Sequence, residues 1–286
     1  IIGRVSFCYW PPGRMGGASE APGARSFVRG AVKRVEDLRV TLMPAGSSRI
    51  GGGHVLRCRS LAAALELQGV SCRWVASPEA RSLFSQADDV AAWGDPFGLR
   101  GEELLGRHIP PGEMVVVDSY LPSMAWFRAV GSRWRLVVVD DNREREVEDA
   151  AAAVLNPNPG AEDLPYRRHP GVRLLLGASY ALLRPAFWDL SSEDRGYVFA
   201  VAGASDPQHV LLQLVRWWVP SWPPLVAVAG PLMREEDVAE LQREARGRPF
   251  VEVLNAPEDF SERMAAAGRV LCTSSGTSLE ALALRK

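Results

Sequence analysis

The alternation of short apolar runs with helical stretches is the feature that most constrains the fold of this chain. Runs of aliphatic and β-branched residues, such as MVVVDSY at 114–120 and LVVVDD at 136–141, are separated by stretches in which apolar residues recur at helical spacing. The first pattern is typical of strands buried on both faces, and the second of amphipathic helices. We therefore expect an α/β fold of parallel sheets with helices on both faces.

The alternation occurs twice along the chain. A proline-containing, charged joint, RPAFWDLSSEDRG at 184–196, lies between the two sets of runs. We expect one Rossmann-like domain over residues 36–188 and a second over 189–286. Residues 1–35, rich in Gly, Pro, Ala and Ser, are interpreted as a disordered or non-native leader. The final EALALRK lies inside a helical pattern, so we expect the second domain to be truncated.

Composition limits the classes of partner. A formal net charge of -1 gives no electrostatic footprint for nucleic acid, and no apolar run is long enough to span a membrane. The four cysteines show no CxxC or metal-like spacing, which fits reduced thiols in a cytoplasm. We expect a cytoplasmic monomer with neither a nucleic-acid nor a membrane partner.

A glycine-rich turn, GGGHVL at 51–56, follows the first apolar run and leads directly into a helical pattern. Glycines at such a turn allow close backbone approach, and the free amides of the helix start attract an anion such as phosphate. A turn without any ligand fits the same local sequence equally well. A dinucleotide fingerprint is excluded, because its third glycine would stand where Leu56 is found.

His54 and Arg57 lie in the first turn of the expected helix. An imidazole there projects into the same space as the glycine turn, where a neutral ring can accept a proton from water. The alternative is that His54 only caps the helix. Arg57 could pair with a phosphate or a carboxylate, or lie as a solvated arginine on the helix surface.

Polar residues end several expected strands. Asp118 and Tyr120 end one run, and Asp140 with Asp141 ends the next. Such carboxylates could orient His54, contact sugar hydroxyls, hold a divalent metal or cap turns and helices. His54 and Cys58 could share a metal, but no further soft ligands lie nearby in the sequence. We therefore expect no metal and no cofactor.

Strands of the second half also end in small or polar residues, at 203–205 and 274–276. Ligands of open parallel sheets bind outside these carboxyl ends, so the cleft between the two domains is the expected site. Trp217, Trp218 and Trp222 are interpreted as structural residues that pack a helix end against the core. Neither a GxSxG elbow nor a P-loop motif is present.

The segments GGGHVLRCRSLA, VVVDSY, VVDDN, LLGASYALLRPAF, GASDP and SSGTSLEALAL, taken together and in this order, resemble a known enzyme family. They are similar to UDP-2,4-diacetamido-2,4,6-trideoxy-altropyranose hydrolases of pseudaminic acid biosynthesis. The resemblance runs from about Leu38 to the last residue and implies the GT-B architecture, two Rossmann-like domains facing a cleft. It departs from the family at Ala204 and Ser275, where glycine is usual.

The resemblance implies roles for particular residues. His54 would be the base that activates water, beside substrate-binding residues of the first domain. UDP would be held by the second domain, without a metal. The implied substrate-binding residues are Gly51, Gly53, Arg57, Asp118 and Tyr120, and the implied UDP-binding residues are Gly203, Gly276, Thr277 and Glu280.

The function implied is hydrolysis of a UDP-activated diacetamido deoxysugar, with UDP-sugar as the partner. Two other hypotheses remain open. One is a GT-B glycosyltransferase that uses a UDP-sugar donor and passes the sugar to an acceptor. The other is a sugar-nucleotide binding module without catalytic activity.

Overall fold

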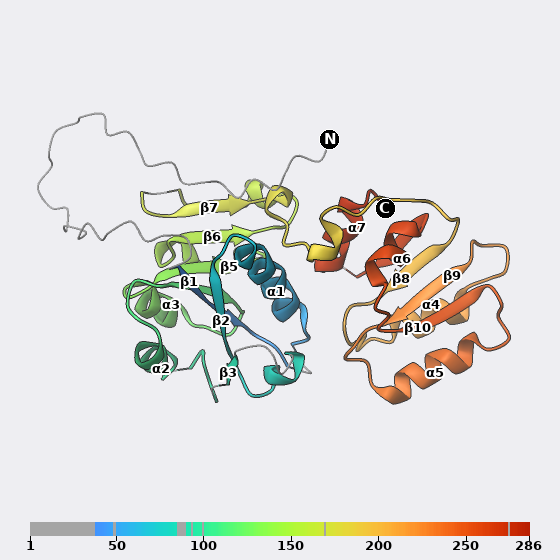
Figure 1. The fold of residues 1–286 in the computed structure, drawn as a ribbon, viewed down its shortest axis with the longest axis horizontal. Helices are drawn as coiled ribbons and strands as arrows, with labels where there is room; N and C mark the ends of the chain where they lie inside the picture. Colours follow the sequence, from blue (N-terminus) through green and yellow to red (C-terminus); the bar gives the residue numbers. More distant parts are fainter. Residues whose placement is uncertain are drawn as a thin grey trace, which may run out of the picture.

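The computed structural model describes residues 38–47, 50–84, 90–92, 94–98, 100–168, 170–273 and 275–286. The expected leader at 1–35 lies outside the described residues. Two α/β units lie side by side, one coloured blue to yellow and the other orange to red (Figure 1). Every strand pair in both sheets is parallel, which confirms the expected fold class.

Among the described residues, the first sheet has seven strands in the order β3-β2-β1-β4-β5-β6-β7. From β1, the chain adds β2 and β3 on one side of the sheet. It then crosses to the other side of β1, where β4 to β7 follow in order. This leaves a topological switch point between β1 and β4, where ligands of such sheets bind. The strands are β1 (Arg39–Pro44), β2 (Ser71–Ala76), β3 (Val90–Ala92), β4 (Met114–Asp118), β5 (Arg135–Val139), β6 (Ala153–Asn156) and β7 (Arg173–Leu176).

Helices cover both faces of the first sheet, because successive strand residues point to opposite sides. On one face Leu42 of β1 packs in a cluster with Val55 of α1 (Gly53–Glu66). On the other, Met43 packs in a cluster with residues of α2 (Gly101–His108) and α3 (Met124–Gly131). The continuous apolar runs are thus explained by burial on both faces.

In the part of the chain that the structure describes, the second sheet has four strands in the order β10-β9-β8-β11, with its own switch point between β8 and β11. Its core lies in two clusters, one shared with α4 and α5 and the other with α6 and α7. The elements are β8 (Val198–Val201), α4 (Val210–Trp217), β9 (Leu225–Ala229), α5 (Glu235–Ala245), β10 (Val251–Asn255), α6 (Phe260–Ala266), β11 (Arg269–Cys272) and α7 (Gly276–Ala283). The division of the chain at 188/189 stays a prediction.

The apolar run at 174–184 is a strand only to Leu176; Gly177 then takes a positive φ of 93°, and the chain continues in short 3-10 turns. Trp218 is buried, as expected of a packing residue, but Trp217 is 70% exposed and Trp222 50% exposed. The structural interpretation is therefore wrong for Trp217, which lies on the outer side of its helix end.

Two further features concern thiols and membranes. Cys58, Cys72 and Cys272 are free thiols, as the sequence predicted. Within the described part of the chain, no helix combines the length and apolar character that crossing a bilayer requires.

Candidate functional site

The predicted site residues of the first domain lie together at the switch point of the first sheet. Pro44 at the end of β1 pairs with Asp118 at the end of β4, and Asp118 pairs with Val139 at the end of β5. The glycine turn follows β1 and Asp141 follows β5, so these groups meet at one sheet edge. Strand register alone therefore brings together side chains that lie far apart in sequence.

The glycine turn faces the second domain. Gly51 has a φ of +84°, which favours glycine, and Gly52 caps α1. A methyl group on Gly53 would meet no atom within 4 Å, whereas one on Gly52 would lie 3.5 Å from Leu232 Cδ1 and 3.9 Å from Ala204 Cβ. The start of α1 is thus open at Gly53 and, at Gly52, is in contact distance of the β8 and β9 loops.

His54 is held by a buried carboxylate. Its Nδ1 lies 2.6 Å from Asp118 Oδ1, and the two side chains are almost entirely buried. Because the carboxylate accepts a hydrogen bond, Nδ1 carries the proton and Nε2 is left as an acceptor. The Tyr120 ring packs edge-on against the imidazole at a centroid distance of 5.0 Å. The ring orientation and the tautomer are therefore both set by neighbours.

Arg57 joins two carboxylates. Its Nε and Nη2 donate to Asp118 at 2.7 and 2.6 Å, and its Nη1 donates to Asp141 at 2.6 Å. Burial alone would lower the pKa of the guanidinium, but the charges and hydrogen bonds of Asp118 and Asp141 raise it above its usual value. Arg57 is thus a charged, largely buried link in the network, and its hypothesis as a solvated surface arginine is wrong.

Asp141 ties Tyr120 into the same network. The Tyr120 hydroxyl donates to Asp141 Oδ2, and Asn158 Nδ2 lies 3.2 Å from Asp141 Oδ1. Burial opposes ionisation of Asp141, yet the hydrogen bond and charge of Arg57 lower the pKa of this carboxyl. Burial and the bond to Asp141 raise the pKa of the Tyr120 hydroxyl. Tyr120 therefore stays protonated, half exposed beside His54.

A second layer of polar side chains supports this edge and was missed from the sequence. Asn156 Nδ2 donates to the Asp141 carbonyl at 3.0 Å, and the Tyr166 hydroxyl donates to Asp140 Oδ2 at 2.7 Å. The position of Asn156 at the end of β6 was the available signal, since it follows an apolar run just as Asp118 does. Asp140 is consequently a structural carboxylate turned toward Tyr166.

The predicted UDP-binding residues lie at the switch point of the second sheet. Gly203 follows β8, and Gly276 with Thr277 starts α7 after β11, a strand that pairs directly with β8. Gly203 has a φ of +80°, and a methyl group on Gly276 would meet no atom within 4 Å. The helix start at Gly276 is therefore sterically open.

Glu280 is engaged in an ion pair that the sequence did not indicate. Arg184, from the segment between the two sheets, donates its Nε and Nη2 to the two carboxylate oxygens, each at 2.6 Å. Glu280 is only 4% exposed, and the guanidinium also lies over the Phe187 and Phe260 rings. Nothing local in the sequence signals this pair, because its members are 96 residues apart.

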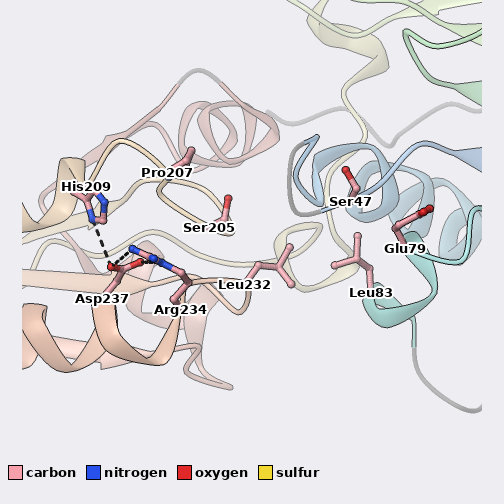
Figure 2. Close-up of a pocket in the computed structure, with 9 residues that line it drawn as sticks. All are labelled: Ser47, Glu79, Leu83, Ser205, Pro207, His209, Leu232, Arg234 and Asp237. Carbon is pink, nitrogen blue, oxygen red and sulfur yellow. Dashed lines mark hydrogen bonds and ion pairs between the residues drawn. The ribbon is translucent and has the colours of Figure 1, made fainter.

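A cavity of about 400 Å³ lies between the two domains, and Figure 2 shows its lining side chains. Ser47, Glu79 and Leu83 come from the first domain, and the others from the loops after β8 and β9 and from α5. Asp206, beside the cavity, accepts hydrogen bonds from the Val210 and Leu211 amides, so the start of α4 is already capped. The other lining residues are Ser205, Pro207, His209, Leu232, Arg234 and Asp237.

Metal ligation was one alternative for the acidic strand ends. Within the described residues, no group of three or more His, Cys, Asp or Glu side chains is arranged to hold a metal ion. Burial raises the pKa of the Cys58 thiol well above its usual value, which disfavours the thiolate that binds metals. Arg57 instead occupies the space between Asp118 and Asp141.

Comparison with solved structures identifies the fold. The chain superposes on Acinetobacter baumannii MurG with a TM-score of 0.56 at 14% identity, over 87% of this chain and 76% of that protein. This is the GT-B fold. S. aureus MnaA, solved with UDP, superposes with a TM-score of 0.56 at 13% identity, over 87% of this chain and 77% of MnaA.

A third GT-B neighbour is a glycosyltransferase from Rickettsia africae, with a TM-score of 0.51 at 10% identity over 87% of this chain and 78% of that one. At these identities the likeness establishes the fold alone. No protein-family model matches the chain, and no curated protein matches it.

Proposed function

We propose that this chain hydrolyses a UDP-activated 2,4-diacetamido-2,4,6-trideoxy sugar to free sugar and UDP. The observation that carries the proposal is the His54–Asp118 pair, with 2.6 Å between Nδ1 and Oδ1, at an open glycine turn. A histidine held in this tautomer has one nitrogen available to accept a proton. The GT-B fold, shared with a protein solved with UDP, supports a UDP-sugar as substrate.

In this mechanism His54 Nε2 accepts a proton from water while the water oxygen bonds to the anomeric carbon. The bond between that carbon and the UDP oxygen breaks, and its electron pair leaves with UDP. Asp118 stabilises the imidazolium that forms, and Arg57 and Tyr120 shape the sugar side of the site. Direct displacement on one face inverts the anomeric centre.

The two domains divide these tasks in the proposal, with the boundary at 188/189. The first domain supplies the base, and the second holds UDP with Gly203, Gly276, Thr277 and Glu280. Helix starts and backbone amides stabilise the negative charge that develops on the departing diphosphate, so no metal is required. The cavity between the domains borders the glycine turn at Ser47, and its lining residues do not include His54 or the residues assigned to UDP.

The test is a coupled assay of UDP release from a panel of UDP-sugars, with chelator and without any acceptor. His54→Ala should lower the rate by roughly 10²- to 10⁴-fold, because general base catalysis contributes that much. His108→Ala, a change at the end of α2, is the matched control and should retain the rate. Full activity of His54→Ala would sink the proposal.

A glycosyltransferase that uses a UDP-sugar donor is the second candidate, favoured by the glycosyltransferase among the GT-B neighbours. It predicts no UDP release in the same assay until an acceptor is added. A binding module without activity predicts UDP binding with no release under either condition.

A further inference from the structure

The second domain carries an arginine-rich hollow of about 430 Å³ on its surface. It lies between the end of α4 and the end of α5 with the loop that follows. Arg216 comes from α4, and the other side chains come from α5 and its loop. The lining residues are Arg216, Glu240, Arg243, Glu244, Arg246 and Arg248.

The hollow has surplus positive charge. Arg216 pairs with Glu240 at 2.9 Å and with Glu244 at 3.2 Å, and Arg248 also pairs with Glu244. Within the described part of the chain, neither Arg243 nor Arg246 forms an ion pair. Four arginines against two glutamates leave a net charge of +2, so the hollow attracts anions.

Exposed tryptophans border this hollow. Trp217, the last residue of α4, is 70% exposed, and Trp222, in the short loop that follows, is 50% exposed. Arg248 Nη1 donates to the Trp218 carbonyl at 3.3 Å, so one lining arginine anchors the loop. The buried Trp218 ring packs edge-on against Trp222 and donates its Nε1–H to the Pro223 carbonyl at 2.8 Å. Trp222 is thus held through Trp218 beside Arg248, and Trp217 directly follows the lining residue Arg216.

We infer that this surface docks the protein on a membrane containing anionic phospholipids. Indoles lie at the headgroup level of bilayers, and arginines bind the phosphates of anionic lipids. A protein partner fits less well, because a stable interface needs about 800 Å² on each side and the exposed tryptophans here lie only at the end of α4 and in the short loop that follows. The expectation of no membrane partner rested on the lack of a spanning segment, which surface binding does not require.

The docking surface leaves the cleft accessible. His209, at the start of α4, lines the cavity between the domains, whereas Trp217 ends the same helix. Eight helical residues span about 12 Å. Membrane and cavity ligand thus contact opposite ends of α4, and the inference stands independently of the proposed hydrolysis.

Cosedimentation of the full chain with phosphatidylcholine vesicles, with or without phosphatidylglycerol, tests the inference. The protein should pellet only with the anionic vesicles, and less as salt rises. Arg243→Gln with Arg246→Gln should weaken binding about 25-fold, at about fivefold for each arginine. Trp217→Ala with Trp222→Ala should release the protein into the supernatant.

Matched controls lie on the first domain. Arg107→Gln with Arg128→Gln removes the same charge, and Leu67→Ala removes an apolar side chain that is also 70% exposed. Both should bind like wild type, with folding checked by circular dichroism. Absence of pelleting, or equal pelleting of all variants, would overturn the inference. Self-association that disappears in the tryptophan variant, without vesicle binding, would assign the surface to protein contacts instead.

Discussion

At the scale of single residues, Asp118 holds two other side chains of the candidate site in place. It is fully buried and accepts hydrogen bonds from both His54 and Arg57. A carboxylate in this position needs both partners, because an unpaired buried charge is strongly destabilising. The same contacts that satisfy the buried Asp118 oxygens therefore fix the imidazole for proton transfer.

Asp118→Asn tests this arrangement. An amide at this position can present its NH₂ group to Nδ1 and select the wrong imidazole tautomer, so the rate of UDP release should fall by roughly 10³-fold. Rates come from the coupled assay, and the fold is checked by near-UV circular dichroism. Asp163→Asn, an exposed carboxylate in a 3-10 turn, is the control. A folded Asp118→Asn protein with wild-type activity would contradict the assigned role.

Asp141 is expected to make the stability of the fold depend on pH. Against the effect of its burial, Arg57 lowers the pKa of this carboxyl below its unfolded value of about 3.9. Its charged form therefore stabilises the fold fully above about pH 5, and this stability is lost as pH falls through the folded pKa. In urea unfolding at pH 7, the free energies of unfolding of wild type and Asp141→Asn should differ by about 1.5–3 kcal/mol. The difference should shrink below pH 4, and a constant gap down to pH 3 would refute the prediction.

At the scale of elements, the start of α1 offers two glycines with different demands. Gly51 has a φ of +84°, so Gly51→Ala should cost about 1–2 kcal/mol in the free energy of unfolding. Gly53 lies in the first turn of the helix with open space beside it, so Gly53→Ala should leave stability unchanged or slightly raised. Urea unfolding of both variants measures the difference.

The same pair separates folding from ligand binding. If the sugar nucleotide approaches the backbone at the start of α1, the methyl group of Gly53→Ala enters the space that it needs. Binding of the UDP-sugar, followed by calorimetry, should then weaken about tenfold in this stable variant. Unchanged affinity would show that the turn is purely structural.

The sequence predicted the elements better than their contacts. Strands such as β4 and β5 were found because burial on both faces leaves continuous apolar runs. The three-residue β3 was missed because so short a run carries no period. The proximity of His54 and Asp118 was foreseeable from the strand-end rule, whereas the orientation of Arg57 between two carboxylates depends on side-chain packing that no local pattern encodes.

At the scale of the whole molecule, the Arg184–Glu280 pair links the segment between the sheets to α7 of the second domain. Glu280 is buried, and Arg184 is its bidentate partner, covering Phe260 as well. Removal of either partner leaves the other without its counter-charge. We therefore expect the two side chains to be coupled energetically.

A double-mutant cycle measures this coupling. Arg184→Met and Glu280→Gln should each lower the free energy of unfolding by about 1–3 kcal/mol, a range reduced because the arginine is one-third exposed. Once one partner is gone, the second change removes no further pairing, so the double variant should cost less than the sum of the single ones. Additive losses would mean that packing of the Arg184 guanidinium over Phe260, and not the ion pair, joins the interdomain segment to the second domain.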